Sequence, residues 1–94
     1  MKADNAQQIK DLIELGTFNP ETLCSGESWI APSASEVCVV RKLISLTDIQ
    51  LANRLDVDER TIRKWKSGKT RMVFTTWCCL CWLAGLGMLI DEPA

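Results

Sequence analysis

Apolar residues recur at intervals of three and four along the chain, which is the pattern of helices that bury one face. The first such stretch is "DNAQQIKDLIEL", and four of its apolar residues share a face: Ala6, Ile9, Leu12 and Ile13. Asp4 or Asn5 is available as its N-cap, and Gly16 would end it. The pattern therefore predicts an N-terminal helix.

Residues 17–32 have a different composition, because Pro20, Gly26 and Pro32 interrupt them. Glycine and proline at such a density are typical of loops rather than of long helices. The segment is therefore predicted to be a loop, with one short helical turn near Glu21–Cys24.

A capping box marks the start of the next helix. Ser33 stands three residues before Glu36, so the two side chains can satisfy the free backbone amides at a helix start. Behind this pair, apolar residues recur at helical spacing: Val37, Val40, Leu43 and Ile44. The pattern predicts a helix that begins just after Ser33.

A second capping box, Thr47 with Gln50, opens the helix after it. Leu46 and Leu51 stand at the two positions of a hydrophobic staple, which fixes how the chain enters a helix. This helix is predicted to run to about Leu55.

A tight turn and a third helix follow in "DVDERTIRKWKSG". Asp56 tolerates the left-handed conformation that a tight turn needs, second best to glycine. Asp58 is a suitable N-cap for the helix "ERTIRKWKS", which Gly68 would end. Two short helices with a break of about three residues have helix-turn-helix spacing, here at residues 47–67.

The stretch "TDIQLANRLDVDERTIRKWKSG" resembles the helix-turn-helix of phage and plasmid repressors of the Cro/C1 type. Ala52 falls where that family needs a small residue, and four residues fall on its buried positions: Leu55, Val57, Ile62 and Trp65. Asp56 stands where the family usually has glycine, which costs some turn stability. The resemblance covers about residues 35–86 and implies an all-α fold of about five short helices around a DNA-binding core.

A narrower resemblance continues beyond the third helix. The run "RKWKSGKTRMVFTTWCCLCWLAGLG" looks like small plasmid and phage repressors of the Kor type, in which a tryptophan- and leucine-rich run follows the recognition helix. Val73 replaces the proline that is usual there. This likeness implies a transcriptional repressor from a mobile element.

Helical spacing turns Ile62 and Trp65 inward and leaves five side chains on or beside the outer face of the third helix: Glu59, Arg60, Thr61, Arg63 and Lys64. On a helix in the major groove these residues would read bases, since arginine can bridge guanine O6 and N7 and glutamate can accept from cytosine N4. Five others suit phosphate contacts, behind this helix or at the start of the preceding one: Lys66, Lys69, Arg71, Thr47 and Gln50.

Charge is unevenly distributed, although the net charge is only −1. Residues 1–36 hold six acidic and two basic residues, whereas residues 60–71 hold six basic and no acidic residues. A basic run can be an ordinary solvated helix face, and Glu59 can serve only to complement the helix dipole. The position of this run, on the exposed side of a capped helix after a tight turn, favours contact with DNA.

Residues 72–90, "MVFTTWCCLCWLAGLGMLI", carry no charge and hold three of the five cysteines. Their length suffices for a membrane helix, so a C-terminal anchor is one alternative. A metal site is less favoured, because Cys78, Cys79 and Cys81 point to different sides of a helix and the chain has no histidine. The two short helices of a helix-turn-helix need a further helix to cover them, so this stretch is expected to pack on that core.

One face of this apolar helix is predicted to be core: Trp77, Leu80, Cys81 and Ala84. A helix that is apolar all round is buried on all sides, and a chain of this size has little core of its own. The spare face is therefore expected to contact a second subunit through Cys79, Leu83 and Leu86.

The sequence thus predicts a homodimeric repressor that binds double-stranded DNA at a palindromic operator of a plasmid or phage. Residues 1–32 are assigned to an acidic helix and loop that act as an arm or dimerisation element, residues 33–90 to the helix-turn-helix domain, and residues 91–94 to a tail. The rival hypothesis is a protein-binding inhibitor or antirepressor on the same scaffold, and a lesser one is a membrane-anchored regulator.

Other classes are disfavoured by what the chain lacks. No acid–base pair or activated nucleophile appears, so no enzyme, cofactor or metal is expected. No secretory signal is visible, and an odd number of cysteines does not suit a disulfide framework, which favours the cytoplasm. The acidic N-terminal helix is left as a possible site for a protein partner.

Overall fold

The computed structural model describes residues 2–87, and within this range the fold is all-α, as predicted. Five α-helices follow one another: α1 (Lys2–Glu14), α2 (Ala34–Lys42), α3 (Asp48–Leu55), α4 (Glu59–Ser67) and α5 (Phe74–Leu83). Two short 3₁₀ helices, η1 (Pro20–Leu23) and η2 (Gly26–Ser28), lie in the loop between α1 and α2.

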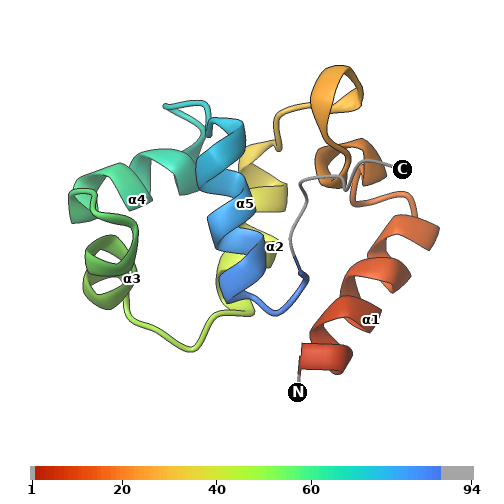
Figure 1. Cartoon of the computed structure of the whole chain (residues 1–94), viewed down its shortest axis with the longest axis horizontal. Coiled ribbons are helices and arrows are strands. Elements are labelled where there is room, and N and C mark those ends of the chain that lie inside the picture. Colours follow the sequence, from red (N-terminus) through yellow and green to blue (C-terminus); the bar gives the residue numbers. More distant parts are fainter. Residues whose placement is uncertain (1, 88–94) are drawn as a thin grey trace.

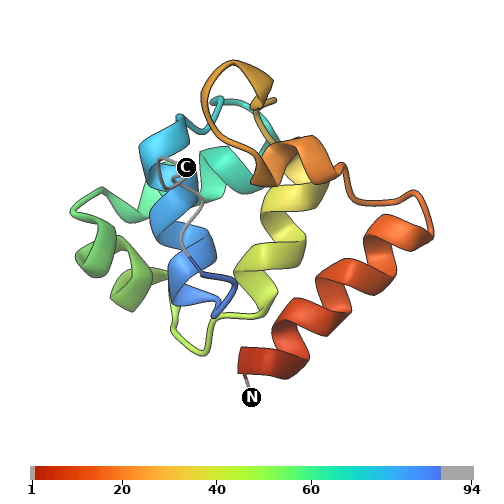
Figure 2. The ribbon, with the colours of Figure 1, turned by 45° about the vertical axis from the view of Figure 1, so that its right-hand side comes forward.

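Helix α5 lies at the centre of the molecule (Figure 1). The α3–α4 pair lies on one side of it and α1 on the other, while α2 passes behind it (Figure 1). In the turned view α3 and α1 still lie on opposite sides of α5, and α2 is seen between α5 and α1 (Figure 2). One core joins all five helices, with a fully or almost fully buried residue from each: Ile9, Val40, Leu51, Ile62 and Trp77. The predicted covering role of the apolar stretch is therefore confirmed.

Local signals in the sequence placed the starts of α2, α3 and α4 correctly. The side chains and backbone amides of Ser33 and Glu36, and those of Thr47 and Gln50, form complete capping boxes. Asp58 accepts a hydrogen bond from the backbone N–H of Arg60 at 2.8 Å and caps α4.

The ends of α3 and α4 also follow the prediction. Asp56 adopts the left-handed conformation after α3, with φ 57° and ψ 48°. Gly68 adopts φ 80° after α4, where a side chain would also approach the Cβ of Ala34 to 3.3 Å. The α3–turn–α4 unit thus has the boundaries expected of the two helices at residues 47–67.

The predicted N-cap of the first helix is wrong. Helix α1 begins at Lys2, so Asp4 and Asn5 lie within it. Asn5 instead donates from its side-chain amide to the carbonyl of Ala84 at 2.7 Å, just after α5. This long-range partner, which a local capping rule does not consider, joins α1 to the end of the central helix.

The loop before α2 packs closely on the rest of the molecule. Phe18 is 2% exposed and Thr22 is fully buried, and the Glu36 carboxylate accepts a hydrogen bond from the backbone N–H of Asn19 at 2.6 Å. Residues 17–32 therefore share the core of α2–α5, whatever further role residues 1–32 have as an arm or dimerisation element.

The apolar stretch forms a shorter helix than its uncharged length would allow. Helix α5 has ten residues, and no helix in the described range 2–87 is long and apolar enough to cross a membrane. The same range contains no cluster of three or more acidic, cysteine or histidine residues suited to a metal ion. Residues 88–90 of the predicted apolar domain and the predicted tail, residues 91–94, lie outside the described residues.

Candidate nucleic-acid interface

Helix α4 buries one face and exposes the other. Ile62 and Trp65 are 2% and 7% exposed, and α4 packs on both α2 and α3 through this side. Arg60, Arg63 and Lys64 are exposed, while Glu59 and Thr61 are half-buried. All five predicted base-reading residues are therefore at least partly accessible on α4, with Arg60, Arg63 and Lys64 on its exposed face.

The two arginines of this face contact acidic residues at the start of the helix, the N-cap Asp58 and Glu59 of the first turn. A guanidinium nitrogen of Arg63 lies 3.2 Å from the Glu59 carboxylate, and Nε of Arg60 lies 3.5 Å from the Asp58 carboxylate. Exposed pairs of this kind contribute only about 0–1 kcal/mol, so they can be exchanged for other anions at little cost. The backbone N–H of Arg60, which donates to Asp58, holds the pKa of that carboxyl below its usual value.

Two of the predicted phosphate-binding residues, Thr47 and Gln50, are exposed at the start of α3. Their side-chain oxygens accept the capping hydrogen bonds, at 3.1 Å for Thr47 and 3.0 Å for Gln50. The hydroxyl hydrogen of Thr47 and the amide hydrogens of Gln50 are donors that these bonds do not use. A phosphate at this helix start would also meet the positive end of the α3 dipole.

Lys66, another predicted phosphate-binding residue, is half-buried and lies in an internal ion-pair cluster. Its ammonium donates to one carboxylate oxygen of Asp48 at 2.9 Å, and Arg41 donates from Nε to the other oxygen at 2.9 Å. Arg41 also donates to the carbonyls of Ile44 and Leu46. The cluster joins the end of α2, the start of α3 and the end of α4, so Lys66 helps to hold these three helices together.

Lys69 and Arg71 follow α4, and both are exposed. Within residues 2–87, the Lys69 ammonium has no hydrogen-bond or ion-pair partner. Arg71 differs, because its guanidinium lies over the ring of Trp29 at 5.2 Å from the centroid. Sequence reasoning did not find this pair, since 42 positions separate the two residues along the chain.

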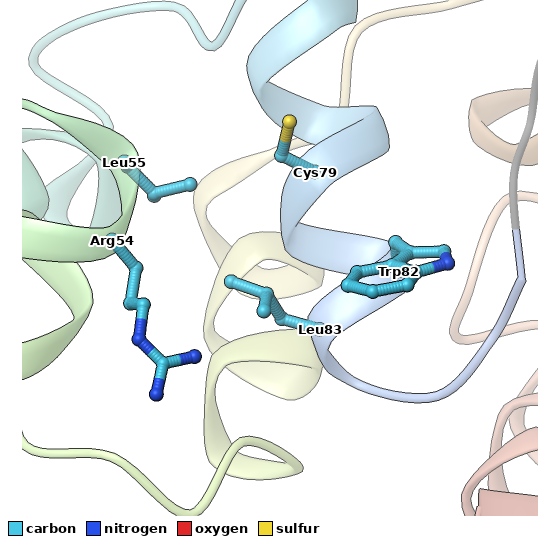
Figure 3. A pocket seen from close by; sticks show the side chains of 5 residues that line it. All are labelled: Arg54, Leu55, Cys79, Trp82 and Leu83. Atoms are coloured by element: carbon cyan, nitrogen blue, oxygen red, sulfur yellow. The ribbon is translucent and has the colours of Figure 1, made fainter.

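An apolar groove lies between α3 and α5, with a volume of about 590 Å³. Arg54 and Leu55 of α3 form one side, and Cys79, Trp82 and Leu83 of α5 form the other (Figure 3). Cys79 is exposed, Leu83 is half-buried and Trp82 is 56% exposed.

The third residue predicted for the dimer interface, Leu86, lies at a different place. It lines a cleft against α1, together with Ala6, Ile9, Lys10, Ile13 and Leu23. The structure thus brings Cys79 and Leu83 together in the groove and separates Leu86 from them.

Two curated proteins are similar to most of this chain. A transcriptional repressor protein KorC of Escherichia coli is 37% identical over 75 residues, which cover 77% of this chain and 88% of that protein. The chain belongs to the KorC family of transcriptional repressors. A second Escherichia coli KorC protein is 33% identical over 72 residues, covering 73% of this chain and 85% of its own length. No family model and no solved structure matches the chain.

In this KorC-family repressor, the cysteines of α5 have different environments. Burial raises the pKa of the Cys81 thiol to about 12, so this group stays neutral and unreactive at physiological pH. Cys79 is exposed on the groove. The "CCLC" run therefore combines packing residues with one accessible thiol.

Three residues that lie against the predicted site residues of this KorC-family repressor were not predicted: Arg41, Trp29 and Trp82. The first two act through contacts with residues that are distant in the sequence or in another element. Trp82 carried a usable signal, because a helix that is apolar all round in a small chain has to expose some large side chain. That signal does not identify which of the large apolar side chains of the helix is the exposed one.

Replacing Asp48 with asparagine is expected to lower the free energy of unfolding by about 1–3 kcal/mol at pH 7, because two cations lose their shared partner. The hydrogen bond from Lys66, with that from Arg41, holds the pKa of Asp48 below its usual value. A lowered folded-state pKa gives stability that is present above pH ~4 and is lost as the pH falls through the folded value. Urea titrations from pH 7 to pH 2.5 measure the free energy of unfolding of both proteins as a function of pH. The difference between wild type and Asp48→Asn should shrink below pH ~4, and a constant difference would contradict the assignment.

Proposed function

We propose that this protein represses transcription by binding a palindromic operator in double-stranded DNA as a homodimer, with α4 of each subunit in the major groove. The observation that carries the proposal is the division of α4 into a buried apolar face and an uncovered basic face. The membership in a family of transcriptional repressors supports it.

The dimensions of α4 suit this role. An α-helix with its side chains is about 10–12 Å in diameter, which fits the width of the major groove, about 12 Å. The nine residues of α4, at 1.5 Å each, give it a length of about 14 Å. Arg60 and Arg63 are assigned to guanine edges, with Glu59, Thr61 and Lys64 at neighbouring bases. The α3–turn–α4 unit would then work as a helix-turn-helix of the Cro/C1 type.

Phosphate contacts would flank the reading helix on two sides. Thr47 and Gln50 offer donors at the start of α3, and Lys69 and Arg71 offer cations after α4. Contacts of this kind fix the orientation of the protein on the duplex but do not read its sequence. Lys66 contributes mainly through Asp48, since its ammonium is already paired.

The homodimer is proposed because one α4 reads too few base pairs for useful specificity in a genome. A two-fold axis doubles the contacts and demands half-sites about 34 Å apart, or one helical turn of DNA. The groove around Cys79 and Leu83 is the assigned contact, because it places exposed apolar groups of α5 beside α3. Leu86 belongs to the α1 cleft and is not needed for this contact.

Selection of bound sites from a random duplex pool, at a stated salt concentration, tests the proposal. An enriched palindrome, bound with an affinity that falls as salt rises, is the expected result. Recovery of no enriched sequence, together with binding that does not depend on salt, would overturn it and favour the protein-docking rival.

Replacing Arg63 with alanine is expected to weaken operator binding by about 1–3 kcal/mol and to relax the preference at particular base pairs. Lys69→Ala serves as the matched control, because it removes one exposed cation from the same region without touching α4. That variant should weaken all duplexes alike and reduce the salt slope by about one. Competition binding with operator and scrambled duplexes separates the two effects. An Arg63→Ala protein with unchanged site preference would refute the assignment of α4 as the reading helix.

A further inference from the structure

The arginine that follows α4 rests on an aromatic platform from the loop before α2. The Arg71 guanidinium carbon is 5.2 Å from the centroid of the Trp29 ring. The edge-to-face partner of Trp29 is Phe74, the first residue of α5, at 5.2 Å and 74°. Arginine over an indole face is held by cation–π attraction, which restricts its rotamers while it stays in solvent.

Trp29 is itself anchored in the core. Its Nε1–H donates to the carbonyl of Thr22 at 3.0 Å, and the Nε1–H of Trp77 donates to the same oxygen at 2.8 Å. Thr22 and Trp77 are both fully buried. The platform is therefore connected to the central helix by two hydrogen bonds, so Arg71 adapts to Trp29 rather than the reverse.

We propose that Trp29 is a positioning residue for DNA binding, which holds the Arg71 guanidinium where it contacts a backbone phosphate beside α4. The inference rests on the operator binding proposed above. It gives the loop of residues 17–32, in the acidic third of the chain, a part in DNA recognition.

The geometry of the stacked pair suits a phosphate in particular. Arg71 stays exposed although its guanidinium lies over the indole, so N–H donors of its planar fork remain open to an anion. Phosphate oxygens match that fork in a bidentate arrangement. Because Arg71 is restrained before DNA arrives, it loses less conformational freedom on binding than a free side chain would.

A double-mutant cycle on the full chain tests the inference, with the selected operator duplex as the probe. Trp29→Leu and Arg71→Ala are measured singly and together, and Trp29→Phe restores an aromatic face without the N–H. Trp29→Leu should weaken binding about two- to fivefold, which is the range of an exposed cation–π contact. It should add little in the Arg71→Ala background, and Trp29→Phe should recover most of the affinity. Equal losses from Trp29→Leu in both backgrounds would overturn the inference.

A second variant leaves Trp29 untouched and so does not depend on how the loop tolerates substitution. Arg71→Lys keeps the charge but loses the planar fork, so it should retain the salt slope of the wild type and still bind more weakly. If Arg71→Lys bound the duplex with wild-type affinity, the inference about Trp29 and Arg71 would be overturned, but the proposed function would not. A wild-type protein that shows no salt-dependent binding to the duplex would overturn the proposed function instead.

Discussion

Replacing Cys79 with glutamate is expected to convert the repressor from dimer to monomer and to weaken operator binding at least tenfold. Cys79 is exposed on the groove between α3 and α5, so a two-fold contact there would bury two new carboxylates near the axis. Burying unpaired charge in a contact costs far more than exposing it on a free subunit. Weak binding to nonspecific duplexes should remain, because the basic residues after α4 are unchanged.

Sedimentation equilibrium measures the oligomeric state, and titration of the operator measures the affinity. Thr75→Glu is the matched control, because it places the same charge at an exposed position of α5 that does not line the groove. Thr75→Glu should stay dimeric. A wild-type protein that sediments as a monomer at the concentrations that saturate the operator would refute the dimer. A dimeric Cys79→Glu protein would move the contact elsewhere, and the cleft lined by Leu86 is then the next surface to test.

Replacing Trp77 with alanine is expected to lower the free energy of unfolding by about 3–5 kcal/mol. The side chain is fully buried, and its removal leaves both a cavity and a Thr22 carbonyl with one donor fewer. Small domains have about 5–15 kcal/mol of stability in total, so this loss would be a large fraction of it.

The loss in free energy of unfolding is measured by urea denaturation, with circular dichroism as the signal. Both variants are made in the Cys79→Glu background, in which dimerisation is not expected to contribute to stability. Trp82→Ala is the comparison, because it removes the same side chain from the same helix at a position that is 56% exposed. A loss for Trp82→Ala within about 1 kcal/mol of zero is expected. Equal losses at the two positions would contradict the assignment of Trp77 to the core and Trp82 to the surface.

The parts of the fold that were predicted correctly depend on short-range physics. Capping boxes at Ser33 and Thr47 act over three residues, and the left-handed turn at Asp56 is a property of one residue and its neighbours. Helical periodicity then separates the inner and outer faces of α4 without knowledge of what covers them. These features are sufficient to predict the α3–turn–α4 unit and its exposed basic side chains.

The parts that were missed depend on contacts between distant segments. Asn5 looks like a local cap, but its partner is the carbonyl of Ala84. Lys66 looks like a free surface cation, but Asp48 and Arg41 meet it only after three helices have packed. Nothing local to Trp29 or Arg71 indicates that they stack. Such pairs require the relative placement of the helices, which periodicity alone does not provide.

The ion pairs at the tip of α4 have a consequence for how the repressor would search a genome. Asp58 and Glu59 pair with Arg60 and Arg63, so in the proposed reading helix these two arginines would add little net charge away from the operator. Attraction to random DNA would then come mainly from the other cations on and after the helix: Lys64, Lys69 and Arg71. The protein would slide along the duplex on these contacts while Arg60 and Arg63 stay paired with their own carboxylates. Only a half-site that offers better partners than Asp58 and Glu59 would stop it.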